Sequence, residues 1–220
     1  FLSAPIGEEI SKALAVLFLA RVIDSAKRGF QIGFSVGLGF ALLENMIYIL
    51  GSILAGEGAA ITFIFTAVLR AIGSIPGHAT WTAISGYAIG HYVISKRWNE
   101  RSLGVFDKSK TQQDSQWILF DGKTGQPMIS SRTEKEAPLL PKWLSAGQNK
   151  MFKITDKPIK AVGIAILFHA IWNGSLWTIS VALQDTSIGI QIFANLLITF
   201  TLIALLWTIL RRLVPFAVLE

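Results

Sequence analysis

The stretch APIGEEISKALAVLFLARVI, residues 4–23, is an apolar helix-forming sequence that carries three ionisable side chains near its start. Glu8 and Glu9 are adjacent, and Lys12 follows within one helical turn of both. Residues three and four apart are neighbours on a helix, so both acids can contact the lysine. The stretch therefore predicts a helix that holds a compact charged group inside or at the edge of an apolar layer.

The composition of the whole chain is that of a membrane protein. Of its 220 residues, 52% are hydrophobic and only 15% are charged, and the mean hydropathy is +0.52. Soluble domains carry about 25% charged residues. The absence of cysteine excludes disulfides and thiolate chemistry. The chain begins with Phe1 rather than Met, which favours a trimmed or processed form and leaves open whether an upstream helix precedes it.

Five apolar segments are candidates for membrane helices, since a bilayer core needs about 20 apolar residues as helix. We therefore expect an all-α, polytopic transmembrane helix bundle. The third segment is too long for a single simple span, and Pro76 lies near its middle, so it is either one kinked helix or a span plus a second piece. The five segments are residues 1–24, 32–55, 59–95, 159–183 and 189–210.

A polar segment of about 60 residues, 96–157, separates two helical regions, 1–95 and 158–213. It contains twelve Lys/Arg and seven Asp/Glu, so its net +5 accounts for nearly all of the chain's +6. The basic residues are scattered among acids, which argues against nucleic-acid binding and favours a lipid-adjacent loop. Within it, Asp121-Gly122 and Thr124-Gly125 between β-prone flanks favour a small β-hairpin.

The Lys/Arg residues also predict the orientation of the chain in the membrane. They follow the first, third and last apolar segments, whereas the turns at 55–59 and 184–189 contain none. By the positive-inside rule, the basic ends and the loop 96–157 are cytoplasmic, in the cell (plasma or inner) membrane. The two termini of the chain then fall on opposite sides, unless an upstream helix exists.

Ionisable and amide side chains interrupt the apolar segments at several positions. A charge at the bilayer centre costs at least about 2.5–3.5 kcal/mol, so such groups are expected to pair and to face a hydrated interior. At 1.5 Å per residue, Glu9, Glu44 and His169 each lie about 18 Å from the end of their segment, whereas His78 lies about 27 Å from Lys96. The residues concerned are Glu8, Glu9, Lys12, Glu44, Asn45, Arg70, His78, His169 and Asn173.

Four motifs that contain these residues resemble those of the PrsW family of intramembrane proteases. They read EEISK (8–12), FALLEN (40–45), RAIGSIPGHATWT (70–82) and HAIWN (169–173), in the family's order and each inside an apolar segment. The family is distantly similar to the type II CAAX prenyl endopeptidases, which carry a histidine where this chain has Glu44. The resemblance implies an intramembrane endopeptidase whose substrates are single-span or membrane-associated proteins, similar to anti-sigma factors.

Two chemical interpretations of this residue set remain open. In the first, Glu8 or Glu9 activates water, His78 or His169 assists, and the Asn173 amide stabilises the oxyanion. In the second, a glutamate and two histidines hold a zinc ion and a free glutamate of the pair is the base. The expected catalytic residues are Glu8, Glu9, Glu44, His78, His169 and Asn173, the zinc ligands Glu44, His78 and His169, and the supporting residues Lys12, Asn45 and Arg70.

A non-proteolytic membrane protein is the alternative function, because buried acids and histidines also mark ion or proton pathways. A pseudoenzyme that binds membrane peptides has the same residue types. A transporter usually has more spans and internal repeats, and neither is visible here. Glycines 33, 37 and 39 are interpreted as helix-packing positions, because no strand precedes them as in a phosphate-binding loop.

Overall fold

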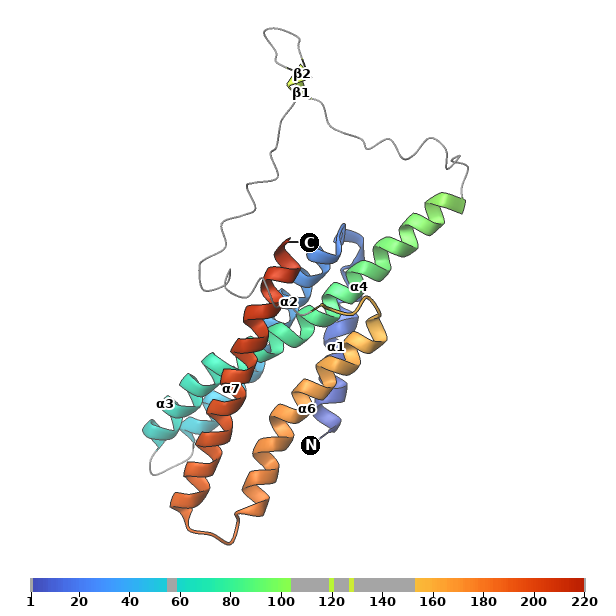
Figure 1. Cartoon of the computed structure of the whole chain (residues 1–220). Coiled ribbons are helices and arrows are strands. Elements are labelled where there is room, and N and C mark those ends of the chain that lie inside the picture. The colour runs from blue at the N-terminus through green and yellow to red at the C-terminus, as the bar shows by residue number, and fades with distance from the viewer. Residues whose placement is uncertain (1, 55–58, 104–118, 121–126, 129–152, 220) are drawn as a thin grey trace.

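The computed structural model describes residues 2–54, 59–103, 119–120, 127–128 and 153–219, and these form a helix bundle (Figure 1). The predicted all-α membrane fold is confirmed. The 3₁₀ turn η1 (Ala20–Val22) links the first two helices, and the π-helical turn η2 (Arg70–Ser74) joins the third to the fourth. The helices are α1 (Ser3–Phe18), α2 (Ala26–Ile53), α3 (Ala59–Leu69), α4 (Ile75–Leu103), α6 (Pro158–Ala182) and α7 (Ile188–Leu219).

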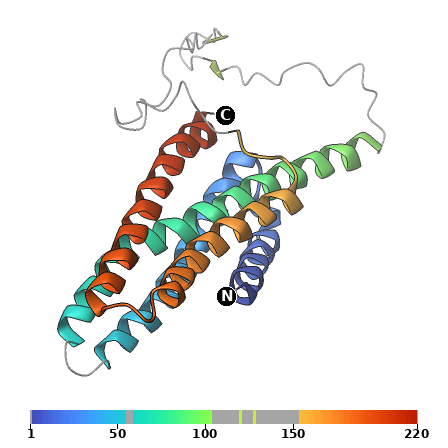
Figure 2. The same cartoon turned by 60° about the horizontal axis from the view of Figure 1, so that its bottom comes forward.

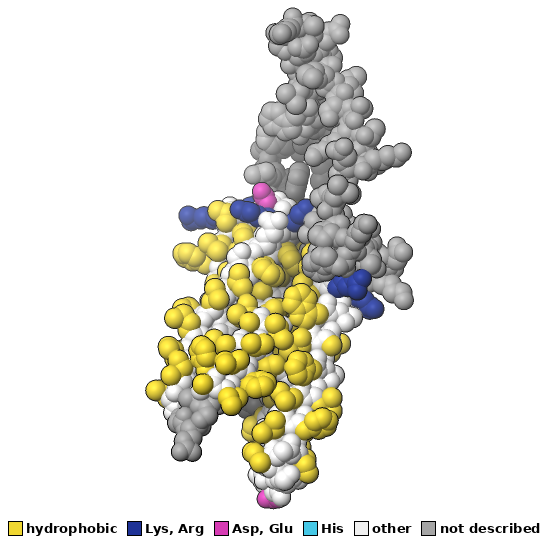
Figure 3. Space-filling view, turned by 90° about the vertical axis from the view of Figure 1, so that its left-hand side faces the viewer, with side chains coloured by type: hydrophobic (Ala, Val, Ile, Leu, Met, Phe, Trp, Pro, Cys, Tyr) yellow, Lys and Arg dark blue, Asp and Glu magenta, His cyan; other side chains and the backbone are white. Residues whose placement is uncertain are grey.

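Among the described helices, three are long and apolar enough to cross a bilayer: α2, α6 and α7. Helix α1 has 16 residues, which at 1.5 Å per residue is about 24 Å and shorter than the roughly 30 Å hydrocarbon core. Large apolar side chains cover the visible flank of the molecule, and Lys and Arg side chains gather at one end of it (Figure 3). The protein is therefore an integral membrane protein.

Residues 59–103 form one continuous helical run rather than two separate pieces. The π-helical turn η2 lies inside this run, and Pro76 follows as the second residue of α4, where the wider turn accommodates a residue without an N–H. Helix α4 continues to Leu103, past the predicted start of the loop at residue 96. The extension is rich in Lys, Arg and Glu, which are good helix formers without being apolar.

Helix α4 lies between α2 and α6 (Figures 1 and 2). Glycines on successive turns of α2 allow its backbone to approach α4 closely. A Cβ added at Gly37 would meet the carbonyl oxygen of His78 and come within 2.9 Å of the Ala79 Cα, and Gly33 is equally close to Ala83. The packing interpretation of positions 33 and 37 is confirmed. It is wrong for Gly39, where nothing lies within 4 Å.

Two further features bear on the polar end of the molecule. Arg97 on α4 donates to the carbonyl oxygens of Ala20 (2.6 Å) and Ile23 (2.7 Å), so it closes the turn between α1 and α2.

Strands β1 (Leu119–Phe120) and β2 (Pro127–Met128) pair in antiparallel fashion, in the segment where the sequence predicts a hairpin. Residues 104–118, 121–126 and 129–152 of the predicted loop lie outside the described residues.

Candidate active site

Four helices, α1, α2, α4 and α6, bring the acids, the lysine and the histidines into one cluster. These residues come from three of the four motifs within the first 78 residues and from one motif near residue 169. Glu9, Lys12, His78 and His169 are buried, and Glu8 and Glu44 are partly buried. His78 lies at the same level of the bundle, beside Lys12, Glu44 and His169, although its distance from Lys96 along the chain predicted a different depth.

Lys12 is at the centre of the cluster, with a side chain that is only 1% exposed. Its Nζ lies 2.7 Å from Glu9 Oε1, 3.5 Å from Glu8 Oε2 and 2.7 Å from His78 Nδ1. The ammonium also lies 4.1 Å from the centroid of the Phe40 ring. A buried ammonium needs such partners, since breaking a buried pair leaves an uncompensated charge. Lys12 therefore connects α1 with both α2 and α4.

Glu9 positions the imidazole of His169. The two side chains approach to 3.0 Å between Glu9 Oε1 and His169 Nδ1, and both are nearly inaccessible to solvent. The other ring nitrogen, Nε2, points toward Glu8, whose Oε2 is 3.9 Å away. A carboxylate on one nitrogen fixes the ring and leaves the other nitrogen for chemistry or for a metal. The two adjacent glutamates thus have different surroundings, with Glu9 held on both sides and Glu8 partly exposed.

His78 has a similar arrangement with a different acid. Its Nε2 lies 2.9 Å from Glu44 Oε2, and its Nδ1 contacts Lys12. Since a lysine ammonium can only donate, Nδ1 accepts and Nε2 carries the proton that faces Glu44. The ring lies 4.8 Å from that of His169 at an angle of 81°. Each histidine is therefore oriented by its own glutamate.

Arg70 supports Glu44 from the π-helical turn η2. Its Nη2 lies 3.3 Å from Glu44 Oε1 and its Nε donates to Asn45 Oδ1. The guanidinium stacks 3.8 Å from the Tyr48 ring centroid. Asn45 in turn donates from Nδ2 to the backbone oxygen of Ala41 at 2.6 Å. The π-helical geometry at Arg70 thus lies where the supporting side chain enters the site, as π-bulges at functional positions commonly do.

Aromatic residues form one wall of the cluster, and the sequence did not single out the most important of them. The Trp81 ring stacks on His169 with a centroid distance of 4.9 Å and an angle of 24°. It also lies 5.3 Å from His78 and 6.4 Å from Trp172. The signal that was available is its position three residues after His78, on the same helical face. Tyr48, four residues after Glu44 on the same face of α2, was also not singled out, although its spacing gives the same signal.

Asn173 lies on α6 one turn after His169 and is partly buried. No contact between described residues joins its amide to the ion pairs of the cluster, so its predicted role toward an oxyanion stays a prediction. The shared helical face of His169 and Asn173 keeps the amide on the same side of α6.

The cluster contains a set of donors that fits a divalent metal ion. One ligand atom each from Glu8, His78 and His169 lie within 4.8 Å of one another. Two imidazoles and one carboxylate are a known ligand set of catalytic zinc. Glu9 and Glu44 lie within 3.0 Å of the second ring nitrogens, as carboxylates around metal-bound histidines do. Buried Glu9 Oε2 also has no hydrogen-bond partner among the described residues.

The carboxylate in this set is Glu8, whereas Glu44 is the ligand predicted from the sequence beside the two histidines. The Glu44 carboxylate already lies 2.9 Å from His78 Nε2 with one oxygen and 3.3 Å from Arg70 Nη2 with the other. Counted formally, the carboxylates of Glu8, Glu9 and Glu44 outnumber the cationic side chains of Lys12 and Arg70 by one. A metal ion or a proton would supply the missing positive charge, and a metal on His78 Nδ1 would compete with the Lys12 ammonium.

Comparison with known proteins places these residues in a family. Residues 1–109 match the family described as PrsW family intramembrane metalloprotease. Protease PrsW of Geobacillus kaustophilus (strain HTA426) is 32% identical over 102 residues, which are 44% of this chain and 41% of that protein. No solved structure matches the chain. The family match includes the motifs up to His78 and ends before His169, whose membership in the site rests on the geometry.

Proposed function

Because this chain belongs to the PrsW family of intramembrane proteases, we propose that it hydrolyses peptide bonds of membrane proteins within or beside the bilayer. The observation that carries the proposal is the convergence of Glu8, Glu9, Glu44, His78 and His169 on one buried cluster. Paired acids and imidazoles supply general base, general acid and orientation, which peptide hydrolysis requires. Burying this much charge without function would be costly.

The two glutamates of EEISK have different roles in this proposal. Glu9 positions His169 and neutralises Lys12, because it is buried and bonded to both. Glu8 faces the water, because it is partly exposed and lies at the looser distances of 3.5 Å from Lys12 and 3.9 Å from His169. Glu8 is therefore the residue that touches the reacting water, directly or as a metal ligand.

A metal ion, where present, would be held by Glu8, His78 and His169, and would supply a Lewis acid and an activated water at neutral pH. In that case Glu44 and Glu9 keep the two imidazole rings in the orientation needed for ligation. Without a metal, Glu8 takes the proton of the attacking water as general base. In both cases the amide of Asn173, one turn after His169 on α6, would donate to the developing oxyanion.

Substrates of the proposed reaction are single-span or membrane-associated proteins, similar to anti-sigma factors by resemblance to the family. We place the polar segment 96–157 on the cytoplasmic side of the cell membrane, because Lys and Arg side chains gather at that end of the bundle (Figure 3). Membrane lipid surrounds the exposed apolar side chains.

A cleavage assay tests this function. The purified protein in nanodiscs is incubated with a single-span peptide, beside the variants Glu8→Gln and His169→Ala and the control Asp185→Asn at the α6–α7 turn. We expect cleavage by the protein and the control, and at least a hundredfold loss in both site variants, the lower end of general acid–base contributions of about 10²–10⁴. Normal cleavage by both variants would exclude this site, and no cleavage by any form would favour a non-proteolytic membrane protein.

Metal analysis of the same preparations separates the two mechanisms. One zinc per protein, lost in His78→Ala and in Glu8→Gln but kept in Glu44→Gln, is expected if Glu8 is the carboxylate ligand. Zinc lost in Glu44→Gln and kept in Glu8→Gln would instead support the ligand set first expected from the sequence. Full activity of metal-free protein after prolonged chelation would favour glutamate catalysis.

A further inference from the structure

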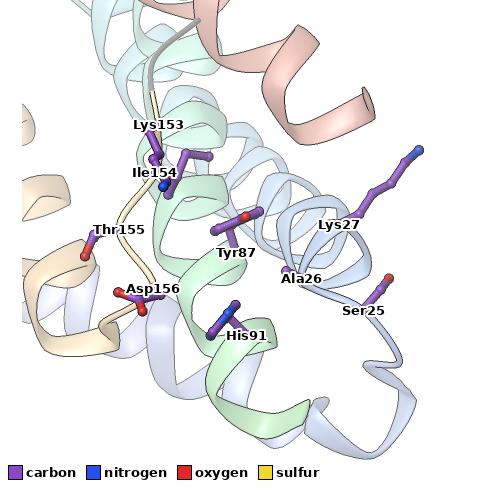
Figure 4. A pocket seen from close by; sticks show the side chains of 9 residues that line it. All are labelled: Ser25, Ala26, Lys27, Tyr87, His91, Lys153, Ile154, Thr155 and Asp156. Atoms are coloured by element: carbon purple, nitrogen blue, oxygen red, sulfur yellow. The ribbon is translucent and has the colours of Figure 1, made fainter. Parts of the chain in front are cut away.

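A cavity at the basic end of the bundle, separate from the acid–histidine cluster, has a volume of about 730 Å³. Three segments far apart in the sequence line it: the start of α2, the second half of α4 and the extended residues before α6 (Figure 4). Tyr87 and His91 lie between the other two segments, and Lys27 extends outward from the start of α2 (Figure 4). Nothing in the proposed proteolysis uses these residues.

The lining of this cavity is rich in hydrogen-bond donors. Six of its side chains carry N–H or O–H groups, and the carboxylate of Asp156 is the one acid among the lining residues. The N-terminus of α2 also faces this side and favours negative charge, although its Arg28 N–H is already capped by Ser25 Oγ. A ligand that is anionic and has several acceptor oxygens complements such a lining. The six side chains are Ser25, Lys27, Tyr87, His91, Lys153 and Thr155. Of these, the Ser25 hydroxyl already donates to Asp24, and Lys27 extends outward (Figure 4).

The cavity walls are built into the fold rather than formed by surface side chains alone. Tyr87 and Ile154 are 7% exposed each and pack in the hydrophobic core with Phe30 and Leu213. Arg97 holds the turn before α2 against α4 through its two bonds to backbone oxygens. Tyr87 and Ile154 therefore give the cavity a packed floor, while the side chains of His91 and Lys153 are exposed above it.

A second, apolar cavity of about 200 Å³ adjoins the first and shares Lys153, Ile154 and Thr155 with it. Its remaining lining residues are hydrophobic and come from α4, α6 and α7. A polar, donor-rich cavity thus continues into an apolar one, at the end of the bundle where lipid headgroups meet the basic side chains. The apolar residues are Ile84, Ile164, Phe168, Ile209 and Leu213.

We propose that these joined cavities bind one anionic phospholipid, with its phosphate among the donors of the polar cavity and an acyl chain in the apolar cavity. Basic pockets between membrane helices on the cytoplasmic side are suited to anionic headgroups. Neither cavity alone selects a lipid. A free phosphate would leave the apolar cavity empty, and a neutral apolar molecule would leave Lys153 and His91 without an anionic partner. The adjacency of the two cavities is what selects an amphiphile.

Native mass spectrometry of the delipidated full chain in detergent tests the proposal. The probes are phosphatidylglycerol and phosphatidylcholine with identical acyl chains, and inorganic phosphate serves as the soluble competitor. We expect one phosphatidylglycerol to bind at least fivefold more tightly than phosphatidylcholine, and phosphate to displace it only weakly. Equal binding of the two lipids, or displacement by phosphate as effective as by short-chain phosphatidylglycerol, would overturn the proposal.

Variants locate the binding. Lys153→Gln is expected to weaken phosphatidylglycerol binding about fivefold, the usual effect of one basic residue near anionic lipid. Lys160→Gln removes an equally exposed charge outside the cavity and should leave binding unchanged. Asp156→Asn removes the opposing carboxylate and should tighten binding, a result that misfolding cannot produce. Equal losses in Lys153→Gln and Lys160→Gln, or no gain in Asp156→Asn, would contradict the site.

Discussion

Replacing Gly37 by alanine tests whether close approach of α2 and α4 sets the geometry of the site. The added methyl group would meet the His78 carbonyl oxygen and come within 2.9 Å of the Ala79 Cα. Carbon atoms in contact prefer about 3.5–4.0 Å, so the helices must part by about 0.5–1 Å. Gly39→Ala is the matched control, because nothing lies within 4 Å of its added Cβ.

The magnitudes follow from this geometry. Both variants gain the same helix propensity, about 1 kcal/mol for glycine to alanine in a helix. Only Gly37→Ala incurs overpacking, which costs about 1–3 kcal/mol, so this is the expected difference between their unfolding free energies. Parting the helices also lengthens the 2.9 Å contact between Glu44 and His78. A misplacement of about 1 Å costs about a hundredfold in rate.

Thermal unfolding followed by circular dichroism and cleavage of a single-span peptide give the two readouts. We expect Gly39→Ala to match or exceed the parent protein in stability and to keep its kcat. Gly37→Ala should melt at a lower temperature than Gly39→Ala and lose most of its kcat while folded. If the two variants were indistinguishable in both assays, the argument that glycine packing positions His78 against Glu44 would be refuted.

Three further substitutions test contacts around the site. Lys12→Met leaves buried Glu9 without its ammonium, so we expect the free energy of unfolding to fall by about 3–5 kcal/mol in denaturant. Lys160→Met is the control, and an equal unfolding midpoint in the two variants would contradict the buried pair. A lysine at position 70 cannot contact both Glu44 and Asn45 as the Arg70 guanidinium does. We therefore expect Arg70→Lys to lower kcat about 10–100-fold. An unchanged kcat would show that Arg70 does not support the site. Arg97→Gln leaves the carbonyl oxygens of Ala20 and Ile23 without their donor. It should lower the free energy of unfolding by about 1–3 kcal/mol without changing kcat. An unchanged melting temperature would show that Arg97 does not close the α1–α2 turn.

Much of the fold could be predicted from hydropathy alone, since apolar segments of spanning length leave few alternatives to membrane helices. The end of α4 was misjudged because the prediction followed apolar character, and a polar helix leaving the membrane has none. The π-helical turn at Arg70 was not predictable, because proline indicates that the helix is perturbed there and not how the perturbation is resolved.

The members of the site were predictable because charge in an apolar segment is costly and therefore conspicuous. Their pairing was not, since spacing along one helix says nothing about which side chains of different helices meet. Glu8 completes the donor set because the Glu44 carboxylate already contacts Arg70 and His78, and these contacts between helices cannot be read from the sequence. Gly39 shows the same limit, because it follows Gly33 and Gly37 in the sequence but lies on the face of α2 that does not contact α4.

Isotope incorporation tests the central claim, hydrolysis at this site, most directly. The protein in nanodiscs is incubated with a single-span peptide in H₂¹⁸O, and the products are sequenced by mass spectrometry. The proposed function predicts one cleaved bond within or beside the apolar segment, with one ¹⁸O in the new carboxyl terminus and no product from Glu8→Gln. Intact peptide throughout, or equal product from Glu8→Gln, would contradict it.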